Sequence, residues 1–208
     1  MEVRKLIVGL MKSNVYIVYD RKTMKGVMID AGGDGQKILN LVYELGVHIE
    51  YLILTHGHID HISALETIKE KLNPQVIIHK DDLEYLFNAD LNLSSKYARN
   101  NMVYSKQPEY VIDRDQKLKL IGYNFGFIHT PGHTPGSMCI KVKNMLFTGD
   151  TLFNGSIGSD IPPNGNMQLE IVSIKGKLFT IRENLNCYPG HGVITTLHYE
   201  KKNNPYIQ

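Results

Sequence analysis

Short apolar segments separated by turn-forming residues dominate the first third of the chain. Residues 15–19 and 26–29 flank the polar stretch 20–23, and this pattern predicts a β-hairpin. Apolar residues between 38 and 45 recur with helical spacing before Gly46, which predicts an amphipathic helix that ends there. The same reasoning predicts strands over 49–54 and 76–78 and helices over 60–72 and 81–88.

The rest of the chain contains more strands than helices. Apolar runs predict strands over 117–121, 125–128, 137–142, 145–148 and 187–188. Helical spacing predicts helices over 167–180 and 199–203. The stretches 89–112 and 149–166 are polar or rich in Gly, Pro and Asn, so we expect loops there.

The order of these elements predicts the architecture. Two blocks of hairpin material, each followed by helices, favour an α/β fold in which two mixed sheets pack face to face with helices on the outer faces. No repeat, low-complexity segment or linker divides the chain, so we expect one domain over residues 1–208.

Composition excludes several classes of protein. The chain has 42% hydrophobic and 21% charged residues, which is ordinary globular usage. The net charge of +2, from 23 basic and 21 acidic residues, argues against a nucleic-acid partner. No apolar run approaches the roughly 18 residues of a membrane helix. The apolar run 6–11 is shorter than a signal-peptide core of about 7–15 residues, so we expect a cytoplasmic protein. The two cysteines, Cys139 and Cys187, are expected to be reduced and buried.

The segment 55–61, THGHIDH, concentrates metal-binding side chains. His56 and His58 follow a predicted strand and are two residues apart, so both can point to the same side as the strand ends. Asp60 and His61 begin the predicted helix and approach from another direction. One segment can therefore place ligands around two positions about 3.5–4 Å apart, as a binuclear metal site requires.

Three later turns, each following a predicted strand, add more groups of the same kind. They present His133, Asp150 and His191, which brings the number of candidate ligands to seven. Imidazole and carboxylate donors suit divalent zinc, iron, manganese or cobalt. His48, His79 and His198 lie outside these turns, and we interpret them as surface or structural residues. His129 lies four positions before His133, but Pro131 and Gly132 argue against a helix there, so we interpret His129 as structural.

These motifs resemble the metallo-β-lactamase superfamily, most closely its short bacterial glyoxalase II-like hydrolases. The resemblance rests on 55–61 and on the segments 29–32 (IDAG), 130–134 (TPGHT), 148–153 (TGDTLF) and 189–192 (PGHG). It covers nearly the whole chain and implies an αββα sandwich with the metals at one edge of the sheets.

The resemblance also implies a role for each site residue. His56, His58 and His133 would hold one metal, Asp60, His61 and His191 the second, and Asp150 would bridge both. The two divalent metals would be zinc, with iron or manganese as alternatives. Asp30 would orient a ligand histidine by accepting its other ring proton. Phe153 and Asn154, which closely follow Asp150, are the candidate substrate-binding residues.

The implied reaction is hydrolysis of a small-molecule thioester such as S-2-hydroxyacylglutathione. A hydroxide held by the metals would attack the carbonyl, and Asp60 would take or hold the proton of the attacking water. Only 17 residues follow His191, which fits the short form without a helical C-terminal domain. Ser159 stands where short relatives usually carry an arginine.

Three alternatives remain open. The first is another hydrolase of this fold, acting on a lactone, a phosphoester or, less favoured without an export signal, a β-lactam. The second is a persulfide dioxygenase with a single iron, for which four of the seven ligands would be superfluous. The third is a non-enzymatic module that has kept the fold. Elemental analysis, oxygen uptake and thiol release separate these readings.

Overall fold

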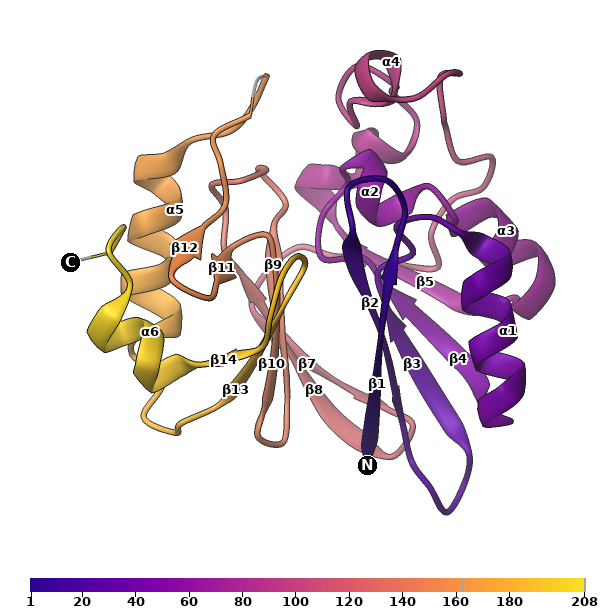
Figure 1. The fold of residues 1–208 in the computed structure, drawn as a ribbon, viewed down its shortest axis with the longest axis horizontal. Coiled ribbons are helices and arrows are strands. Elements are labelled where there is room, and N and C mark those ends of the chain that lie inside the picture. The colour runs from indigo at the N-terminus through magenta and orange to yellow at the C-terminus, as the bar shows by residue number, and fades with distance from the viewer. Residues whose placement is uncertain (162, 208) are drawn as a thin grey trace.

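Two mixed six-stranded β-sheets pack face to face, and helices cover the outer face of each sheet (Figure 1). The computed structural model describes residues 1–161 and 163–207. The predicted α/β sandwich is therefore confirmed. Among the described residues, no helix combines the length and the apolar character needed to cross a bilayer.

The first sheet keeps its strands in sequence order, from β1 at one edge to β6 at the other. Its first three strands pair antiparallel, whereas β3 to β6 pair parallel. The parallel connections carry helices α1 (Gly35–Leu45) and α3 (Leu65–Leu72). The strands are β1 (Glu2–Val8), β2 (Ser13–Tyr19), β3 (Lys25–Ile29), β4 (His48–Ile53), β5 (Gln75–His79) and β6 (Tyr110–Ile112).

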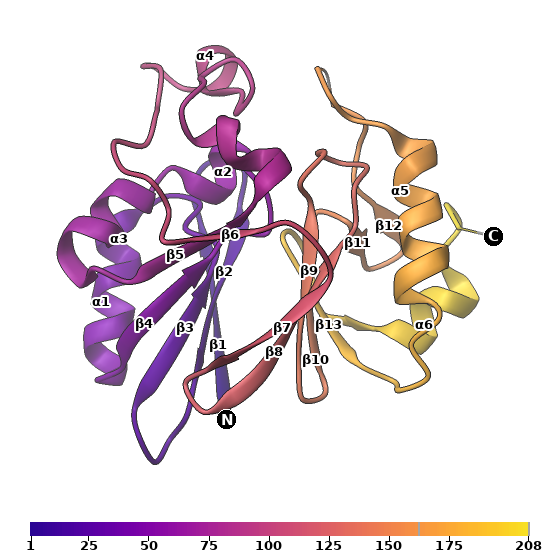
Figure 2. The same cartoon turned by 180° about the vertical axis from the view of Figure 1, so that it is seen from behind.

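The second sheet has the order β14-β13-β10-β9-β8-β7 and is antiparallel except where β10 meets β13. Figure 2 shows α5 (Met167–Ser173) and α6 (Leu197–Asn203) on its outer face. The strands are β7 (Gln116–Leu120), β8 (Tyr123–His129), β9 (Met138–Val142), β10 (Met145–Gly149), β13 (Asn186–Pro189) and β14 (Thr195–Thr196).

Alternation along the central strands explains the layers. Neighbouring side chains in a strand point to opposite faces. In β2, Val18 packs between the two sheets, whereas Ile17 packs under the helices that cover the first sheet. Ile53 and Leu52 divide in the same way in β4. Both faces of the first sheet are therefore buried, as parallel sheets require.

The helix predicted over 60–72 is wrong in its continuity, because the chain forms two helices there. The segment α2 (Ile59–Ile62) ends before α3 begins at Leu65. The backbone N–H of Ala31 donates to the carbonyl of His61 at 2.8 Å, and the Ala31 carbonyl accepts from the Ala64 N–H at 2.8 Å. Ala31 thus inserts into the helical ladder, and this tertiary contact has no sequence signal.

Other predictions need smaller corrections. The loop predicted over 89–112 contains α4 (Ser94–Tyr97) and ends in β6. The helix predicted over 81–88 is a 3₁₀ helix, η1 (Lys80–Leu86). The loop over 149–166 carries a small hairpin of β11 (Leu152–Phe153) and β12 (Ser156–Ile157). The helix over 167–180 continues beyond α5 as a π-helical turn, η2 (Ile174–Leu178). Strand β1 was not predicted, because charged residues interrupt its apolar positions.

Candidate metal centre

The seven candidate ligands gather at one end of the sandwich, where strands from both sheets finish. His56 and His58 follow β4, and Asp60 and His61 lie on α2 directly afterwards. The second sheet contributes the others from the segments after β8, β10 and β13. Residues far apart in the sequence therefore meet because both sheets end at the same place. The second-sheet ligands are His133, Asp150 and His191.

Two glycines allow these turns to approach one another. A Cβ on Gly57 would lie 2.3 Å from the Cβ of Tyr85, so only glycine lets the chain between His56 and His58 pass there. A Cβ on Gly190 would lie 2.1 Å from Asp150 Oδ1 and 2.7 Å from His61 Cε1. The glycines thus keep space for ligands on both sides of the centre.

One group of possible donors consists of His56, His58 and His133. Their ligand atoms lie within 4.8 Å of one another, and all three residues are buried. His58 Nδ1 lies 2.9 Å from His133 Nε2, and the His56 ring centroid lies 4.9 Å from that of His58. Three imidazoles facing one space are suited to a divalent metal.

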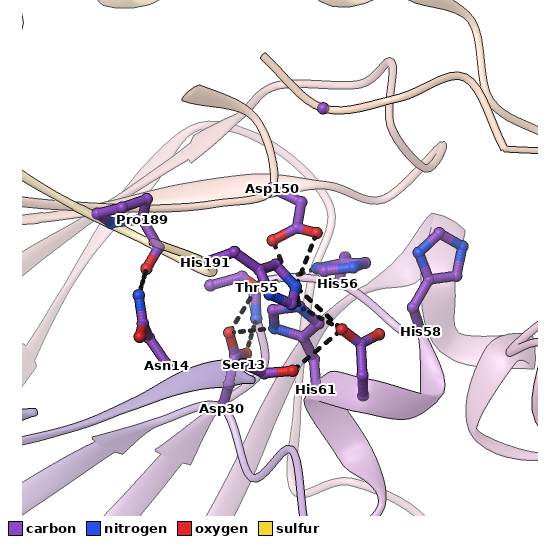
Figure 3. Close-up of polar contacts among 12 residues, drawn as sticks. Ser13, Asn14, Asp30, Thr55, His56, His58, His61, Asp150, Pro189 and His191 are labelled. Carbon is purple, nitrogen blue, oxygen red and sulfur yellow. Dashed lines mark hydrogen bonds and ion pairs between the residues drawn. The ribbon is translucent and has the colours of Figure 1, made fainter. Parts of the chain in front are cut away.

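A second group consists of Asp60, His61 and His191, whose ligand atoms also lie within 4.8 Å of one another. Asp60 Oδ2 lies 3.0 Å from His191 Nε2 and 3.4 Å from His61 Nε2. Figure 3 shows the side chains of His61 and His191 converging beneath Asp150.

Asp150 lies between the two groups. Its Oδ2 is 3.7 Å from His133 Nε2 and 3.4 Å from His191 Nε2, and its Oδ1 is 3.3 Å from His61 Nε2. The structure thus brings together all seven residues in the arrangement that the resemblance implies. Metal ligation by them stays a prediction.

The first group is electrostatically prepared for a metal. Burial, together with a smaller effect of the neighbouring histidines, lowers the pKa of His56 and lowers that of His58 to about 3. Both rings are therefore neutral at physiological pH, which is the form that coordinates metals. His56 Nε2 is buried without a hydrogen-bond partner among the described residues, and so is Asp150 Oδ1. Buried polar atoms are rarely left without a partner, so these orphaned donors fit a cation.

The second group shows the opposite shifts. Burial opposes protonation of His61, but the nearby charges of Asp150, Asp60 and Asp30 outweigh it and raise the pKa. Burial also opposes protonation of His191, whose hydrogen bonds to Asp150 and Asp60 raise the pKa to about 9. The carboxylates are buried, yet the charge of His61 and the hydrogen bond from His191 hold the pKa of Asp60 and Asp150 below the usual range. The two carboxylates therefore stabilise positive charge on or beside the two imidazoles, and bound metals can supply that charge.

Asp30 occupies the position predicted for it. This buried carboxylate accepts from His61 Nδ1 at 2.9 Å, from the Thr55 N–H at 2.7 Å and from the Thr55 hydroxyl at 2.8 Å. The bond to Nδ1 turns Nε2 of His61 toward Asp60 and Asp150. Its left-handed backbone, with φ 61°, is tolerated by aspartate better than by most residues.

Two buried carboxyl groups near the centre were not predicted from the sequence. Asp82 accepts from the Gly57 N–H at 2.9 Å, the Thr134 hydroxyl at 2.7 Å and the Gly136 N–H at 2.6 Å. It therefore ties the 55–61 segment to the turn that carries His133. Glu170 on α5 accepts from the Gly158 N–H at 3.1 Å and supports the segment leading to Ser159. A lone acidic residue in a helix carries no signal of such a contact.

A cavity of about 420 Å³ opens beside the candidate ligands. Phe153 lines it, with its ring centroid 6.2 Å from that of His191, whereas Asn154 is exposed and is not part of the wall. Ser159 also lines it, and its carbonyl accepts from His133 Nδ1 at 2.9 Å. Tyr97, in the stretch 89–112 that could shape a cleft, also lines the cavity, but the sequence pattern does not orient it. Met11, Leu93 and Ile161 were not predicted as wall residues, because their orientation depends on tertiary contacts.

The residues interpreted as structural lie outside this centre. His48 and His198 are exposed, and His79 stacks on His129 with ring centroids 3.8 Å apart. His129 Nε2 donates to the Pro135 carbonyl at 2.8 Å. Cys139 and Cys187 are free and buried, as predicted.

Comparison with known proteins agrees with this geometry. The family described as the Metallo-beta-lactamase superfamily matches residues 8–200. Hydroxyacylglutathione hydrolase GloC of Haemophilus influenzae is 30% identical over 209 residues, covering 100% of this chain and 98% of the relative. The structure of BLEG-1 B3 metallo-beta-lactamase matches with a TM-score of 0.95 and 28% identity over the whole of both chains. That of TTHA1623 in a di-iron-bound form matches with a TM-score of 0.82 and 29% identity, covering 98% of this chain and 99% of the other. The chain thus belongs to the metallo-beta-lactamase superfamily.

Proposed function

We propose that the protein is a binuclear metal-dependent hydrolase that cleaves a small-molecule thioester of the S-2-hydroxyacylglutathione type. The observation that carries the proposal is the pair of donor groups with Asp150 between them, beside an open cavity of about 420 Å³. Metal-dependent hydrolysis is the chemistry of the superfamily to which the chain belongs. We take the thioester substrate class from the hydroxyacylglutathione hydrolase GloC of Haemophilus influenzae, which matches over the full length of this chain.

His56, His58 and His133 would hold one metal and Asp60, His61 and His191 the other, with Asp150 shared. Zinc is the proposed metal, with iron or manganese as alternatives, because imidazole and carboxylate donors accept all three. A divalent metal pair supplies a nucleophilic water at neutral pH and polarises the carbonyl of the substrate.

The protein side chains would orient the reacting groups. Asp60 accepts from the Ser13 hydroxyl at 3.0 Å as well as facing His191, so its carboxylate is fixed at the edge of the cavity. From there it would hold the proton of the attacking water. Phe153 would contact the substrate from one wall of the cavity, to which Met11 of the hairpin between β1 and β2 also contributes. A cytoplasmic location fits the two free, buried cysteines.

Hydrolysis of a β-lactam is the second candidate. It is favoured by the likeness to BLEG-1 B3 metallo-beta-lactamase over the whole of both chains. A persulfide dioxygenase with one iron is less favoured, because Asp60, His61 and His191 form a second donor group that such a centre would not use.

The proposal is tested on one preparation by elemental analysis and by thiol release from S-D-lactoylglutathione at neutral pH. Two metals per chain with thiol release support it. If the protein holds two metals and releases no thiol, but hydrolyses a chromogenic cephalosporin or a lactone, it is a binuclear hydrolase with a different substrate class. One iron per chain with oxygen uptake on a persulfide overturns the hydrolase.

A His61→Ala variant adds a direct test of the metal pair. Loss of one metal together with most hydrolysis, in a protein that keeps its far-ultraviolet circular dichroism, supports a binuclear mechanism. Full activity with one metal per chain contradicts it.

A further inference from the structure

A second hollow adjoins the cavity beside the candidate ligands. We call the cavity of about 420 Å³ the metal-side hollow, and its neighbour, of about 400 Å³, the hairpin-side hollow. The second lies under the tip of the hairpin between β1 and β2. The two share Met11, Ile59, Asp60 and Tyr97 in their walls, so they adjoin at these residues, and we call the pair of hollows the trough, with Asp60 at the junction.

The two hollows differ in charge. Of the described residues, no Lys or Arg lines the metal-side hollow, where Leu93, Phe153 and Ile161 supply an apolar wall. Arg99 is the one cationic residue among the described residues that line the hairpin-side hollow. Ser159 also lines the metal-side hollow and adds no charge to its wall. Among the described residues, the cationic side chain of Arg99 thus lies on the hairpin side.

The loop that carries Arg99 is anchored to the candidate metal centre. Buried Asn92 donates through Nδ2 to the carbonyls of Tyr85 at 2.9 Å and Met102 at 2.8 Å, which closes the loop at its base. The Asn92 carbonyl in turn accepts from the Ile59 N–H at 2.8 Å, beside His58 and Asp60. These contacts fix the base of the loop against the ligand segment. Figures 1 and 2 both show α4 standing above α2.

The guanidinium of Arg99 is available to a ligand. Arg99 is exposed, and no hydrogen bond or ion pair to it occurs within residues 1–161 and 163–207. The neighbouring surface at the tip of the hairpin is apolar and accessible, because the side chains of Leu10 and Met11 there are 100% and 42% exposed. A ligand with a terminal carboxylate would satisfy the arginine, and the methylene groups of the chain beside that carboxylate would cover the apolar surface.

We propose that the trough binds a two-armed thioester whose thiol arm ends in a carboxylate held by Arg99, with an uncharged acyl arm in the metal-side hollow. This inference rests on the proposed thioester hydrolysis. It adds the direction in which the substrate lies and the charge that each arm carries. The planar fork of a guanidinium suits a carboxylate, because both carboxylate oxygens can accept at once.

The test compares Arg99→Met with wild type on two substrates. One is S-D-lactoylglutathione, and the other is the same thioester with the glycine carboxylate converted to a carboxamide. Loss of a hydrogen bond to a charged group predicts that Arg99→Met raises KM about tenfold for the carboxylate substrate, with kcat within about twofold. KM for the carboxamide should be unchanged. Arg114→Met removes the same charge from the exposed chain between β6 and β7, and it should leave both KM values unchanged.

An equal KM for wild type and Arg99→Met on the carboxylate substrate overturns the inference, as does an equal rise on both substrates. A calorimetric titration with S-methylglutathione separates this result from failure of the proposed function, because it needs no turnover. Binding that weakens about tenfold in Arg99→Met supports the anion site even if no thiol is released. Absence of both binding and thiol release removes the inference together with the thioester.

Discussion

Single hydrogen bonds decide which ring nitrogen of three candidate ligand histidines faces the centre. Nδ1 of His61 is held by Asp30, and Nδ1 of His133 is held by the Ser159 carbonyl. Nδ1 of His56 lies 3.1 Å from the Thr55 hydroxyl, which itself donates to Asp30. In all three rings Nε2 is left to face the donor groups. The partners behind these three ligands thus orient the rings so that Nε2 faces the donor groups.

Replacing Asp30 by asparagine should lower the affinity for the metal of the second donor group specifically. The asparagine retains the shape and tolerates the left-handed backbone, but it removes the charge that His61 Nδ1 contacts at 2.9 Å. We expect the affinity of one of two metals to fall by about 10–100-fold while the other is kept. Competition with a chromophoric chelator measures both. Exposed Asp34→Asn is the matched control, and equal affinities in Asp30→Asn and wild type would contradict the role given to Asp30.

Glu170 should make stability depend on pH. It is 0% exposed, and its Oε2 has no hydrogen-bond partner among the described residues. Burial, helped by the charges of Asp150 and Asp160 and opposed by the hydrogen bond from Gly158, raises its pKa from 4.5 to about 8. A raised carboxyl pKa gives stability that is fully present below the unfolded pKa and is lost as pH rises toward 8.

Glu170→Gln is neutral at every pH, so wild type should lose stability relative to this variant as pH rises. The difference should change by about 1.4 kcal/mol per pH unit between pH 5 and 8. Urea unfolding of the metal-loaded proteins at several pH values measures it. Exposed Glu44→Gln should stay within about 0.5 kcal/mol of wild type. A difference for Glu170→Gln that does not vary with pH would show that the carboxyl is ionised throughout.

At the scale of elements, short segments build the walls of the site, and side-chain anchors hold them in place. The loop 92–102 carries only one helix of four residues, α4, which is too short to be stable alone. Ser94 is buried, and its hydroxyl accepts from the Met102 N–H at 2.9 Å. With the bonds of Asn92, this contact replaces the hydrophobic core that such a loop lacks.

Asn92→Ala should therefore loosen the wall that carries Tyr97 and Arg99. It removes the donor of the buried hydrogen bond to the Tyr85 carbonyl, and one of two donors to the Met102 carbonyl, which also accepts from the Ser94 hydroxyl. The unpaired buried carbonyl costs about 1–3 kcal/mol. Tryptic cleavage after Lys96 and Arg99, followed by mass spectrometry, should become faster than in wild type. Asn40→Ala on the exposed side of α1 should cleave at the wild-type rate. Unchanged cleavage in Asn92→Ala would mean that other contacts hold the loop.

The elements also show how far a single sequence predicts this structure. Strands such as β4 and β10 are predicted because their apolar runs are buried on both faces. The break between α2 and α3 is not predicted, because Ala31 causes it from 30 residues away. The four metal-binding side chains in 55–61 can be recognised in the sequence because they lie within one short segment, where a strand ends and a helix begins. Tyr97 and Arg99 do not stand out, since only the anchoring of their loop brings them to the trough.

At the scale of the molecule, the candidate metal centre joins the two sheets. Asn14 on β2 donates through Nδ2 to the Pro189 carbonyl at 2.8 Å, and its N–H donates to the Gly190 carbonyl at 2.6 Å (Figure 3). The Tyr16 hydroxyl reaches the same Pro189 carbonyl at 2.7 Å. Strand β2 of the first sheet thus positions the turn of the second sheet that carries His191. The donor groups are complete only while the sheets stay together.

Removal of metal should therefore destabilise the whole fold, because the metals would bind the folded chain and not the separated sheets. Each metal at several hundred times its dissociation constant contributes about 3–4 kcal/mol, so the proposed pair contributes about 6–8 kcal/mol, which corresponds to about 12–32 °C in Tm for a chain of this size. Differential scanning calorimetry before and after dialysis against a chelator measures the change, and adding zinc back should reverse it. His61→Ala is the matched variant, since it should retain only the first donor group and show a smaller fall. A Tm that chelation leaves unchanged in wild type would mean that the two sheets hold together without help from the centre.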